Sequence, residues 1–333
     1  MLVSVVVGLL NEEKFLPRLI EDFKNQTYPH NKIELIFIDG MSKDTSWQIL
    51  EEFKQSKHDF NNVILLKNPK VILSAGMNVG IKAANGECIL KVDCHSHITD
   101  NFIENNVKVI EEGEYVCGGP RPNIIENEDN LSETLLLVEE NMFGSGIANY
   151  RKQTSKQYVS SVFQGMYKKE IFDKIGLLDE KVGRVEDNEL HYRIRKNGYK
   201  IRYSNDILSY QYTRPTVNRM LKQKYSNGYW IGKVSHVYPK AFSIFHFVPF
   251  VFVLGIIFSL LMLSLTKLFA VLLAVAYGLF TILVTLMTII NNKFNVTMLL
   301  IPILLFLVHF SYGIGTLVGL VKGFSWKKEY YKQ

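Results

Sequence analysis

The first half of the chain alternates short apolar runs, rich in β-branched residues, with amphipathic stretches. The runs are LVSVVVGLL, IELIFID, NVILL and ECILKVD, and between them lie EEKFLPRLIEDFKNQ, TSWQILEEFKQ and SAGMNVGIKAAN. Apolar runs separated by helical stretches are typical of a parallel sheet that helices cover on both faces. The pattern therefore predicts an α/β domain that begins with three strand–helix units.

Residues at the ends of the amphipathic stretches predict the helix boundaries. Asn11 is placed to cap the first helix and Ser74 the third, and Gly86 follows the third helix as a stop.

Beyond residue 113 the pattern loosens. We expect strands at YVCGGP, SVFQGMY and YKIRYS, a helix near SETLLLVEENMF and another over Glu186–Lys196. The Gly- and Ser-containing segment FGSGIANYRKQTSKQ has the composition of a mobile loop facing an acceptor, although ordinary surface loops look the same.

The last third of the chain has a different composition. From Ala241 to Val321 the only Lys or Arg residues are Lys267 and Lys293, and Asp and Glu are absent. A bilayer is crossed by about 20 apolar residues, so this stretch has room for three spans, near 244–265, 268–290 and 296–321. The first two spans require a tight hairpin between them.

Within the third expected span, Gly315 and Gly319 have the spacing that permits close contact between helices, a spacing also common by chance.

The net charge of +6 is unevenly distributed, because His191–Lys240 holds eleven Lys and Arg residues against Asp206 alone. A basic belt before the first span fits attraction to an anionic leaflet and a cytoplasmic orientation, and a solvated basic face is the alternative. The N-terminus lacks a basic region before its apolar run and predicts a first strand, not a signal peptide. Three cysteines without CxxC spacing suit a reducing compartment and a place in the core.

The expected topology contains a conflict. Three crossings after a cytoplasmic domain place the C-terminus outside, whereas the basic tail VKGFSWKKEYYKQ favours the inside. Either one segment lies in the interface or is re-entrant, or the tail breaks the rule.

Candidate chemistry lies where the predicted strands end, because ligands of open α/β sheets bind beyond the carboxyl ends of the strands. Asn11 and Glu12 follow the first strand, Asp39 ends the second, and Asp93 with His95 follows ECILKV. A GxGxxG turn is absent after the first strand, which argues against a dinucleotide site.

These motifs, in order, resemble the family-2 glycosyltransferases with their GT-A fold, over about 230 residues. The segment Asn78–Glu87 resembles the family's N-x-G-I-x-x-A-x-G-E stretch. The resemblance implies a nucleotide-sugar donor, expected to be a UDP-sugar. It also implies donor-nucleotide contacts from Glu12, Asp39, Asn78 and Asp93.

The metal motif departs from the family's usual Asp-x-Asp, since Asp93 is followed by Cys94 and His95. Residues two apart in an extended segment point the same way, so Asp93 and His95 are candidate ligands of one cation that bridges the donor's phosphates, and His97 lies on the same side. An imidazole ligand tilts the preference toward Mn²⁺ over Mg²⁺ without excluding either. In the alternative reading, His95 only packs or bonds locally, and Asp93 alone touches the metal. Asp-x-His resembles a subset of succinoglycan-type enzymes, which favours the ligand reading.

The segment GRVEDNELHYRIRKNGYKI resembles the family's Glu-Asp motif, which implies that Asp187 is the general base with Glu186 beside it, and that a single displacement inverts the anomeric centre. Two acids at a helix N-terminus are also what helix electrostatics favours.

Acceptor contacts are expected from two places. Gln164, next to Gly165, falls where the family keeps an acceptor-site strand, and Arg219 belongs to RPTVNRMLKQKYSNGYWIGK, which resembles the amphipathic segment of membrane-bound members. Arg219 there is placed for a lipid-linked phosphate, and a plain interfacial anchor explains the segment about as well. The QxxRW signature of processive synthases is absent, which disfavours repeated addition.

The sequence thus predicts a GT-A catalytic domain over 1–213, a basic amphipathic interfacial segment over 214–241, and an anchor of about three helices with a short basic tail over 242–333. The expected function is transfer of a sugar to a lipid-linked saccharide in bacterial surface polysaccharide or capsule biosynthesis. The expected protein is multi-pass in the inner (plasma) membrane with a cytoplasmic catalytic domain. It takes Mn²⁺ or Mg²⁺ and binds no nucleic acid. The alternatives are direct transfer to polyprenyl phosphate, or a non-catalytic scaffold that binds nucleotide sugar.

Overall fold

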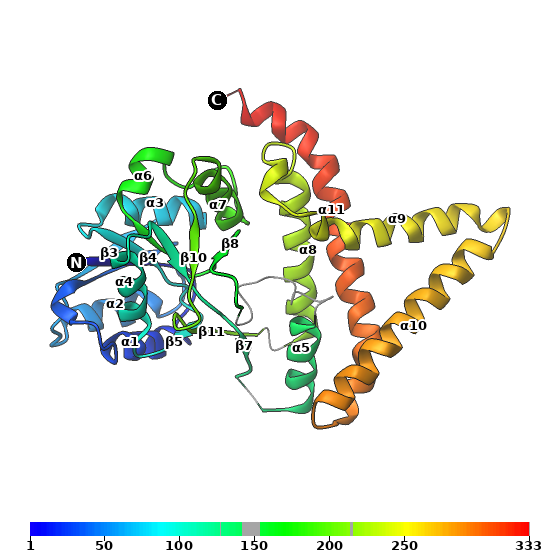
Figure 1. Cartoon of the computed structure of the whole chain (residues 1–333), viewed down its shortest axis with the longest axis horizontal. Coiled ribbons are helices and arrows are strands. Elements are labelled where there is room, and N and C mark those ends of the chain that lie inside the picture. Colours follow the sequence, from blue (N-terminus) through cyan, green and yellow to red (C-terminus); the bar gives the residue numbers. More distant parts are fainter. Residues whose placement is uncertain (127, 142–153, 214–215, 333) are drawn as a thin grey trace. The chain divides into compact units, whose positions relative to one another are not determined.

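The computed structural model describes residues 1–126, 128–141, 154–213 and 216–332. The chain forms two compact units: the first comprises Met1–Asn123 and the described residues up to Tyr212, and the second comprises residues of Ile124–Ile147 with the chain from Thr213 onward (Figure 1). The segment expected to be an acceptor-facing loop spans residues 143–157, and its residues 143–153 lie outside the described residues.

An eight-stranded sheet forms the centre of the first unit, in the order β3-β2-β1-β4-β9-β6-β10-β8. Its first four strands are parallel, and helices connect them as the apolar runs predict. These elements are β1 (Val3–Leu9), α1 (Leu16–Lys24), β2 (Ile33–Asp39), α2 (Ser46–Gln55), β3 (Asn62–Lys67), α3 (Leu73–Ala83) and β4 (Cys88–Lys91). Two apolar clusters, one containing Val5 and Leu35 and the other Val6 and Ile36, pack against the sheet through alternate residues of its strands.

The other half of the sheet, for which the apolar runs predict no parallel order, is mixed. The strand β9 (Met166–Lys168) runs antiparallel to both neighbours, β4 and β6 (Val116–Gly118). Next to β6 lies β10 (Ile201–Tyr203), followed by the antiparallel edge strand β8 (Tyr158–Val159). A strand inserted between β4 and β6 after a long excursion of the chain leaves no repeating strand–helix pattern to read.

A smaller sheet, β5-β11-β7, and four helices complete the first unit and its connection to the second. The strands are β5 (Ser96–Ile98), β7 (Asn123–Ile124) and β11 (Ser209–Tyr212). The helices α4 (Phe102–Glu111), α6 (Glu170–Ile175) and α7 (Glu186–Lys196) belong to the first unit, and α5 (Asn130–Glu140) belongs to the second. The expected range of α7 is confirmed. All three cysteines are free and buried, as expected.

The predicted helix caps are wrong. The helix α1 begins five residues after Asn11, whose backbone is left-handed with φ 54°. Ser74 lies inside α3, and its hydroxyl donates to the carbonyl of Val182 at 3.3 Å. Gly86 follows α3 by three residues, and a Cβ atom there would lie 2.6 Å from the backbone nitrogen of Ser4. Loop-to-loop contacts and close strand packing, not helix ends, account for these residues.

The second unit contains three segments that are long and apolar enough to cross a membrane: Ile244–Ser264, Leu268–Asn291 and Val296–Tyr330. They are built around α9 (Val248–Leu261), α10 (Leu268–Asn291) and α11 (Ile301–Tyr330), and α8 (Val217–Val234) precedes them. The first two match the predicted spans with their tight hairpin, and the third extends nine residues beyond its predicted end.

The contact expected at Gly315 and Gly319 is formed with α8. A Cβ atom would lie 2.2 Å from an α8 carbonyl oxygen at Gly315 and 2.0 Å from another at Gly319. Gly228 and Gly232 of α8 approach the backbone of α11 equally closely. The missing side chains allow the two helices to pack backbone to backbone.

We expect Gly319→Ala to destabilise the second unit, because a methyl group cannot fit against the facing carbonyl without a shift of the helix, at a cost of about 1–3 kcal/mol. Gly278→Ala in α10 is the matched control, since its Cβ would meet no atom within 4 Å. The measurement is thermal unfolding in detergent. Equal melting temperatures for the two variants would contradict the observed packing.

Candidate active site

Hydrogen bonds join the loops that follow β1 and β2. The backbone of Asn11 donates to the Ser42 hydroxyl at 2.8 Å, and the Asn11 side chain accepts from the backbone of Lys43 at 2.8 Å. The Glu12 backbone donates to the Ser46 hydroxyl at 2.8 Å. The two loops therefore form one connected surface at the carboxyl edge of the sheet.

Asp39 lies at the end of β2, on this edge. Only 2% of it is exposed, and its carboxylate accepts from the backbone of Ser42 at 3.1 and 3.2 Å. Exposed apolar side chains follow the ends of β1, β2 and β3: Leu10, Met41, Val71 and Ile72. The edge thus combines a fixed carboxylate with apolar surface.

The structure brings Glu12 and His95 together. Nδ1 of His95 lies 3.3 Å from a Glu12 carboxylate oxygen, and Nε2 lies 3.4 Å from the side-chain nitrogen of Gln211. His95 directly follows Asp93 and Cys94 at the end of β4. His97 instead pairs with Asp22 at 2.9 Å, so its ring belongs to a separate contact.

The donor set at this edge fits a cation that is shared with a ligand. Among the residues that the structure describes, no three His, Cys, Asp or Glu side chains converge closely enough to hold an ion. Asp93 and His95 are the two candidate protein ligands, and they would suit Mn²⁺ or Mg²⁺, which commonly binds through one or two side chains with phosphate oxygens and water completing the shell.

A buried ion pair joins the end of β4 to the start of α7. The amino group of Lys91 donates to both carboxylate oxygens of Asp187, at 2.7 and 2.8 Å, and to Glu186 at 3.3 Å. All three residues are at least 92% buried. The contact ties Asp187 to Lys91, which precedes Asp93 by only two positions.

Burial and charge shift the pKa values of this pair. Burial lowers the pKa of Lys91, but the attraction of Asp187 and Glu186 outweighs it and holds the pKa well above the usual range. Burial raises the pKa of Asp187 to about 7, against the opposing effect of Lys91. A carboxylate that titrates near neutral pH is suited to accept a proton from a substrate.

The acids at the start of α7 do not serve as its cap. The preceding residue, Val185, makes no side-chain cap bond and has a left-handed backbone, with φ 64°. This conformation is unfavourable for a β-branched residue and is typical of functional sites. Strain at Val185 and the Lys91 contact both favour a specific placement of Asp187.

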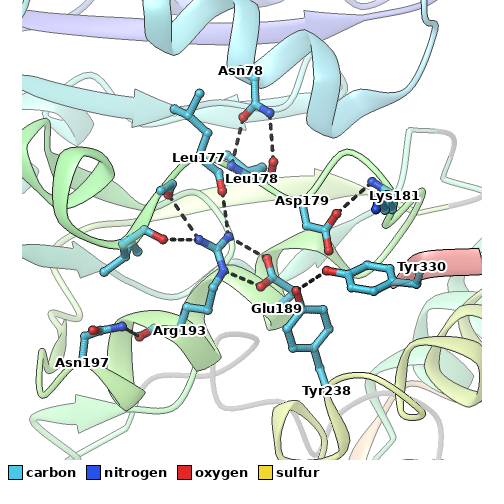
Figure 2. Close-up of polar contacts among 12 residues, drawn as sticks. Asn78, Leu177, Leu178, Asp179, Lys181, Glu189, Arg193, Asn197, Tyr238 and Tyr330 are labelled. Atoms are coloured by element: carbon cyan, nitrogen blue, oxygen red, sulfur yellow. Dashed lines mark hydrogen bonds and ion pairs between the residues drawn. The ribbon is translucent and has the colours of Figure 1, made fainter. Parts of the chain in front are cut away.

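Buried contacts hold α7 in place. His191, one turn after Asp187, lies 2.9 Å from the hydroxyl groups of both Tyr167 and Ser161. Burial lowers the pKa of His191 to about 3, so the ring is neutral. Arg193, shown in Figure 2, pairs with Glu189 at 2.8 Å and donates to backbone carbonyls between α6 and α7.

Asn78 takes part in the same framework. Its amide donates to the Leu178 carbonyl at 2.9 Å and accepts from the Leu178 backbone at 3.0 Å (Figure 2). It also donates to Glu180 at 3.0 Å. This structural role accounts for the side chain, and its expected donor contact stays a prediction.

Of the two expected acceptor contacts, Gln164 lies in the first unit. It is 3% exposed, and within the described part of the chain neither of its amide atoms has a hydrogen-bond partner. The guanidinium carbon of Arg121 lies 3.3 Å from the centre of the adjacent Phe163 ring, and the amino nitrogen of Lys91 lies 5.5 Å from it. A buried polar group without a partner in the protein is suited to a ligand. Arg219 is exposed near the start of α8, in the second unit.

The sequence prediction missed Lys91 and Arg121. A lysine inside the apolar run ECILKVD was the available signal for the first, because a charge in a buried strand needs a partner.

Comparison with known proteins shows the family. The model of glycosyl transferase family 2 matches residues 4–176, just over half of the chain. The chain belongs to this family. The glycosyltransferase resembles a Methanococcus voltae protein named dolichyl N-acetyl-alpha-D-glucosaminyl phosphate 3-beta-D-2,3-diacetamido-2,3-dideoxy-beta-D-glucuronosyltransferase. The two sequences are 28% identical, and the alignment covers 97% of this chain and 98% of the relative.

The resemblance to succinoglycan-type enzymes is also confirmed. The glycosyltransferase is 23% identical to the succinoglycan biosynthesis protein ExoA of Rhizobium meliloti, over 67% of each chain. Among solved structures it resembles a Pyrobaculum calidifontis mannosyltransferase in complex with GDP-Man and Mn²⁺, with a TM-score of 0.65, 15% identity, and coverage of 97% of this chain and 86% of that one. This similarity confirms the GT-A-like fold.

We expect Lys91→Met to raise the pKa of Asp187 further, because it removes the positive charge that favours the carboxylate. The acidic limb of kcat/KM for donor turnover should move to higher pH by about one to three units. The pH–rate profile measures this shift. Lys91→Arg is the control and should keep the limb near pH 7. An unchanged limb in folded Lys91→Met would contradict the role assigned to Lys91.

Proposed function

We propose that this glycosyltransferase moves one sugar from a nucleoside diphosphate sugar to a lipid-linked saccharide, with inversion at the anomeric carbon. The observation that carries the proposal is the buried Asp187, which Lys91 holds beside the strand end that bears Asp93 and His95. A candidate base and a candidate phosphate-binding edge are thereby joined through one residue.

The donor's nucleoside is assigned to the carboxyl edge of β1–β3. Asp39 offers a fixed carboxylate to the base or ribose, and the exposed apolar side chains after the three strands offer a surface for the base. UDP is the proposed nucleotide.

The diphosphate is assigned to the end of β4, with Asp93 and His95 as ligands of Mn²⁺ or Mg²⁺ and Glu12 beside His95. When bound, the cation stabilises the negative charge that develops on the departing diphosphate.

The acceptor hydroxyl gives its proton to a carboxylate oxygen of Asp187 as its oxygen attacks the anomeric carbon. The bond from that carbon to the diphosphate breaks in the same step, so the configuration inverts. Lys91 holds the Asp187 carboxylate in orientation, and Glu186 shares the same lysine.

The acceptor class is supported by the Methanococcus voltae relative, whose name describes transfer to a sugar carried on dolichyl phosphate and which aligns along almost the whole chain. Gln164 in the first unit is the proposed acceptor contact near Asp187, and Arg219 is the proposed contact for the lipid phosphate.

We place the protein in the plasma (inner) membrane with a cytoplasmic catalytic domain, residues 1–213. Residues 214–241 form the interfacial segment and 242–333 the anchor, and surface polysaccharide assembly is the setting.

We expect Asp187→Asn to lower kcat by about 10²–10⁴-fold, because an amide cannot accept the proton. Asp93→Asn and His95→Ala should raise the Mn²⁺ concentration needed for half-maximal turnover. The measurement is nucleoside diphosphate release by protein in detergent, with a membrane lipid extract as acceptor, a panel of nucleotide sugars, and Mn²⁺, Mg²⁺ or EDTA. Asp59→Asn, at an exposed surface site, is the control. Donor binding without turnover under all conditions would favour the non-catalytic scaffold.

The acceptor assignment predicts that polyprenyl diphosphate or phosphate bearing a sugar is used and that bare polyprenyl phosphate is not. Incubation with labelled donor, followed by chromatography of the lipid products, separates the two. Formation of a single-sugar lipid phosphate from bare polyprenyl phosphate would show direct transfer to the lipid instead.

A further inference from the structure

The third apolar segment differs from the other two in how it is buried. In its most apolar stretch of 18 residues, 44% is buried within the protein, compared with 11% in the corresponding stretch of the α9 segment and 17% in that of α10. The α9–α10 hairpin is therefore exposed over most of its surface, as helices surrounded by lipid are. The helix α11 has one packed side and one exposed side.

The packed side of α11 faces α8 and α5, and the hairpin also touches this helix: a Cβ at Gly313 would lie 2.2 Å from the Pro249 carbonyl oxygen of α9, and the Tyr277 hydroxyl of α10 lies 2.8 Å from His309. Near its start, Leu304 and Leu305 share an apolar cluster with Met220 of α8 and with Leu135 and Val138 of α5. Further along are the glycine contacts with α8, and near its end a Cβ at Gly323 would meet the ring of His236, just after α8. The two helices run parallel and side by side along most of α11 (Figure 1).

The opposite side of α11 is an apolar stripe at helical spacing. Its exposed members are Ile303, Phe306, Phe310, Val321 and Phe324, and Leu299 continues the stripe just before the helix. The ring of Phe306 also contacts Phe252 of α9 and Tyr277 of α10. By contrast, the exposed residues of α8 include Asn218, Arg219 and Lys222. The pair of helices therefore has an apolar side that α11 supplies and a basic, polar side that α8 supplies.

Two of the helices that pack against α11, namely α8 and α5, are not suited to cross a bilayer. The helix α8 carries Arg219, Lys222, Lys224 and Lys233 within 18 residues, and charged side chains are costly at the bilayer centre. The helix α5 has only 11 residues, whereas a span needs about 20. Side chains of Glu133 and Thr134, near the start of α5, bond with Asn295 just before α11. A crossing of α11 would draw both helices into the lipid.

We propose that only α9 and α10 cross the membrane, and that α8 and α11 lie together in the plane of its cytoplasmic surface. The apolar stripe of α11 is buried at the boundary between headgroups and acyl chains of an anionic bilayer, and the basic side of α8 faces the headgroups and water. The hairpin tip at Lys267 then lies on the far side, and the C-terminus lies on the same side as the first unit.

Length and charge support this arrangement. The 30 residues of α11 extend for about 45 Å, whereas the hydrocarbon core is about 30 Å thick. Two crossings also keep the basic tail, which carries Lys322, Lys327, Lys328 and Lys332, on the cytoplasmic side. The conflict between three crossings and a basic tail is thereby removed.

Cysteine labelling in membrane vesicles of known orientation tests the topology. A membrane-impermeant maleimide is applied to each side of vesicles that hold Lys57→Cys in the first unit, Lys267→Cys at the hairpin tip or Lys332→Cys near the end. The unaltered chain, whose three cysteines are buried, is the control. We expect positions 57 and 332 to label from one side and 267 from the other.

The alternative topologies give different patterns, and each overturns the proposal. If α11 crosses, 267 and 332 label together from the side opposite 57. If α8 crosses as well, all three positions label from the same side. None of these patterns depends on which substrates the enzyme uses, so the topology and the proposed function can fail separately.

Depth measurements test the in-plane helix directly. Nitroxide labels at Ile303→Cys, Phe310→Cys and Val321→Cys report immersion through their contact with oxygen and with a water-soluble relaxation agent. We expect the three depths to be similar and shallow. Labels at Leu272, Leu279 and Leu286 of α10, which are exposed, should show one deep position between two shallower ones. A deep label at Phe310 between shallow ones would show that α11 crosses. Donor turnover by each labelled protein reports that it is folded.

Discussion

The buried ion pair between Lys91 and Asp187 is the contact on which the arrangement of the first unit depends. A charge in the interior is tolerated only when it is paired and hydrogen-bonded, so neither residue fits its position without the other. Lys91 lies on a central strand and Asp187 begins α7, 96 residues later. The pair therefore fixes the proposed base against the strand that ends at Asp93.

Other contacts around α7 serve the same placement. The neutral His191 ring between Tyr167 and Ser161 holds one side of the helix, and the contacts of Arg193 hold the other. Val185 accepts an unfavourable backbone conformation directly before the acids. The left-handed backbone at Val185 destabilises the fold locally, where Glu186 and Asp187 are directed toward Lys91. The buried hydrogen bonds of His191 and Arg193 offset this cost.

The sequence predicted the features that depend on local pattern. Apolar runs located β1 to β4, charge and spacing located α7, and strand ends located Glu12 and His95, which the structure brings to within 3.3 Å. Features that depend on distant partners were missed. Lys91 has its partner 96 residues away, and the antiparallel β9 enters the sheet only after a long excursion. The helix caps failed because Asn11 bonds to the neighbouring loop.

The stereochemistry of transfer is the sharpest test of Asp187 as the base, since a base that acts in a single displacement permits one outcome. The measurement is the anomeric configuration of the transferred sugar, read from proton NMR couplings of the saccharide released from the lipid product and compared with the donor's known anomer. We expect the transferred sugar to have the inverted anomeric configuration. A product that keeps the donor's configuration would contradict Asp187 as the base and remove the catalytic role from the Lys91 pair.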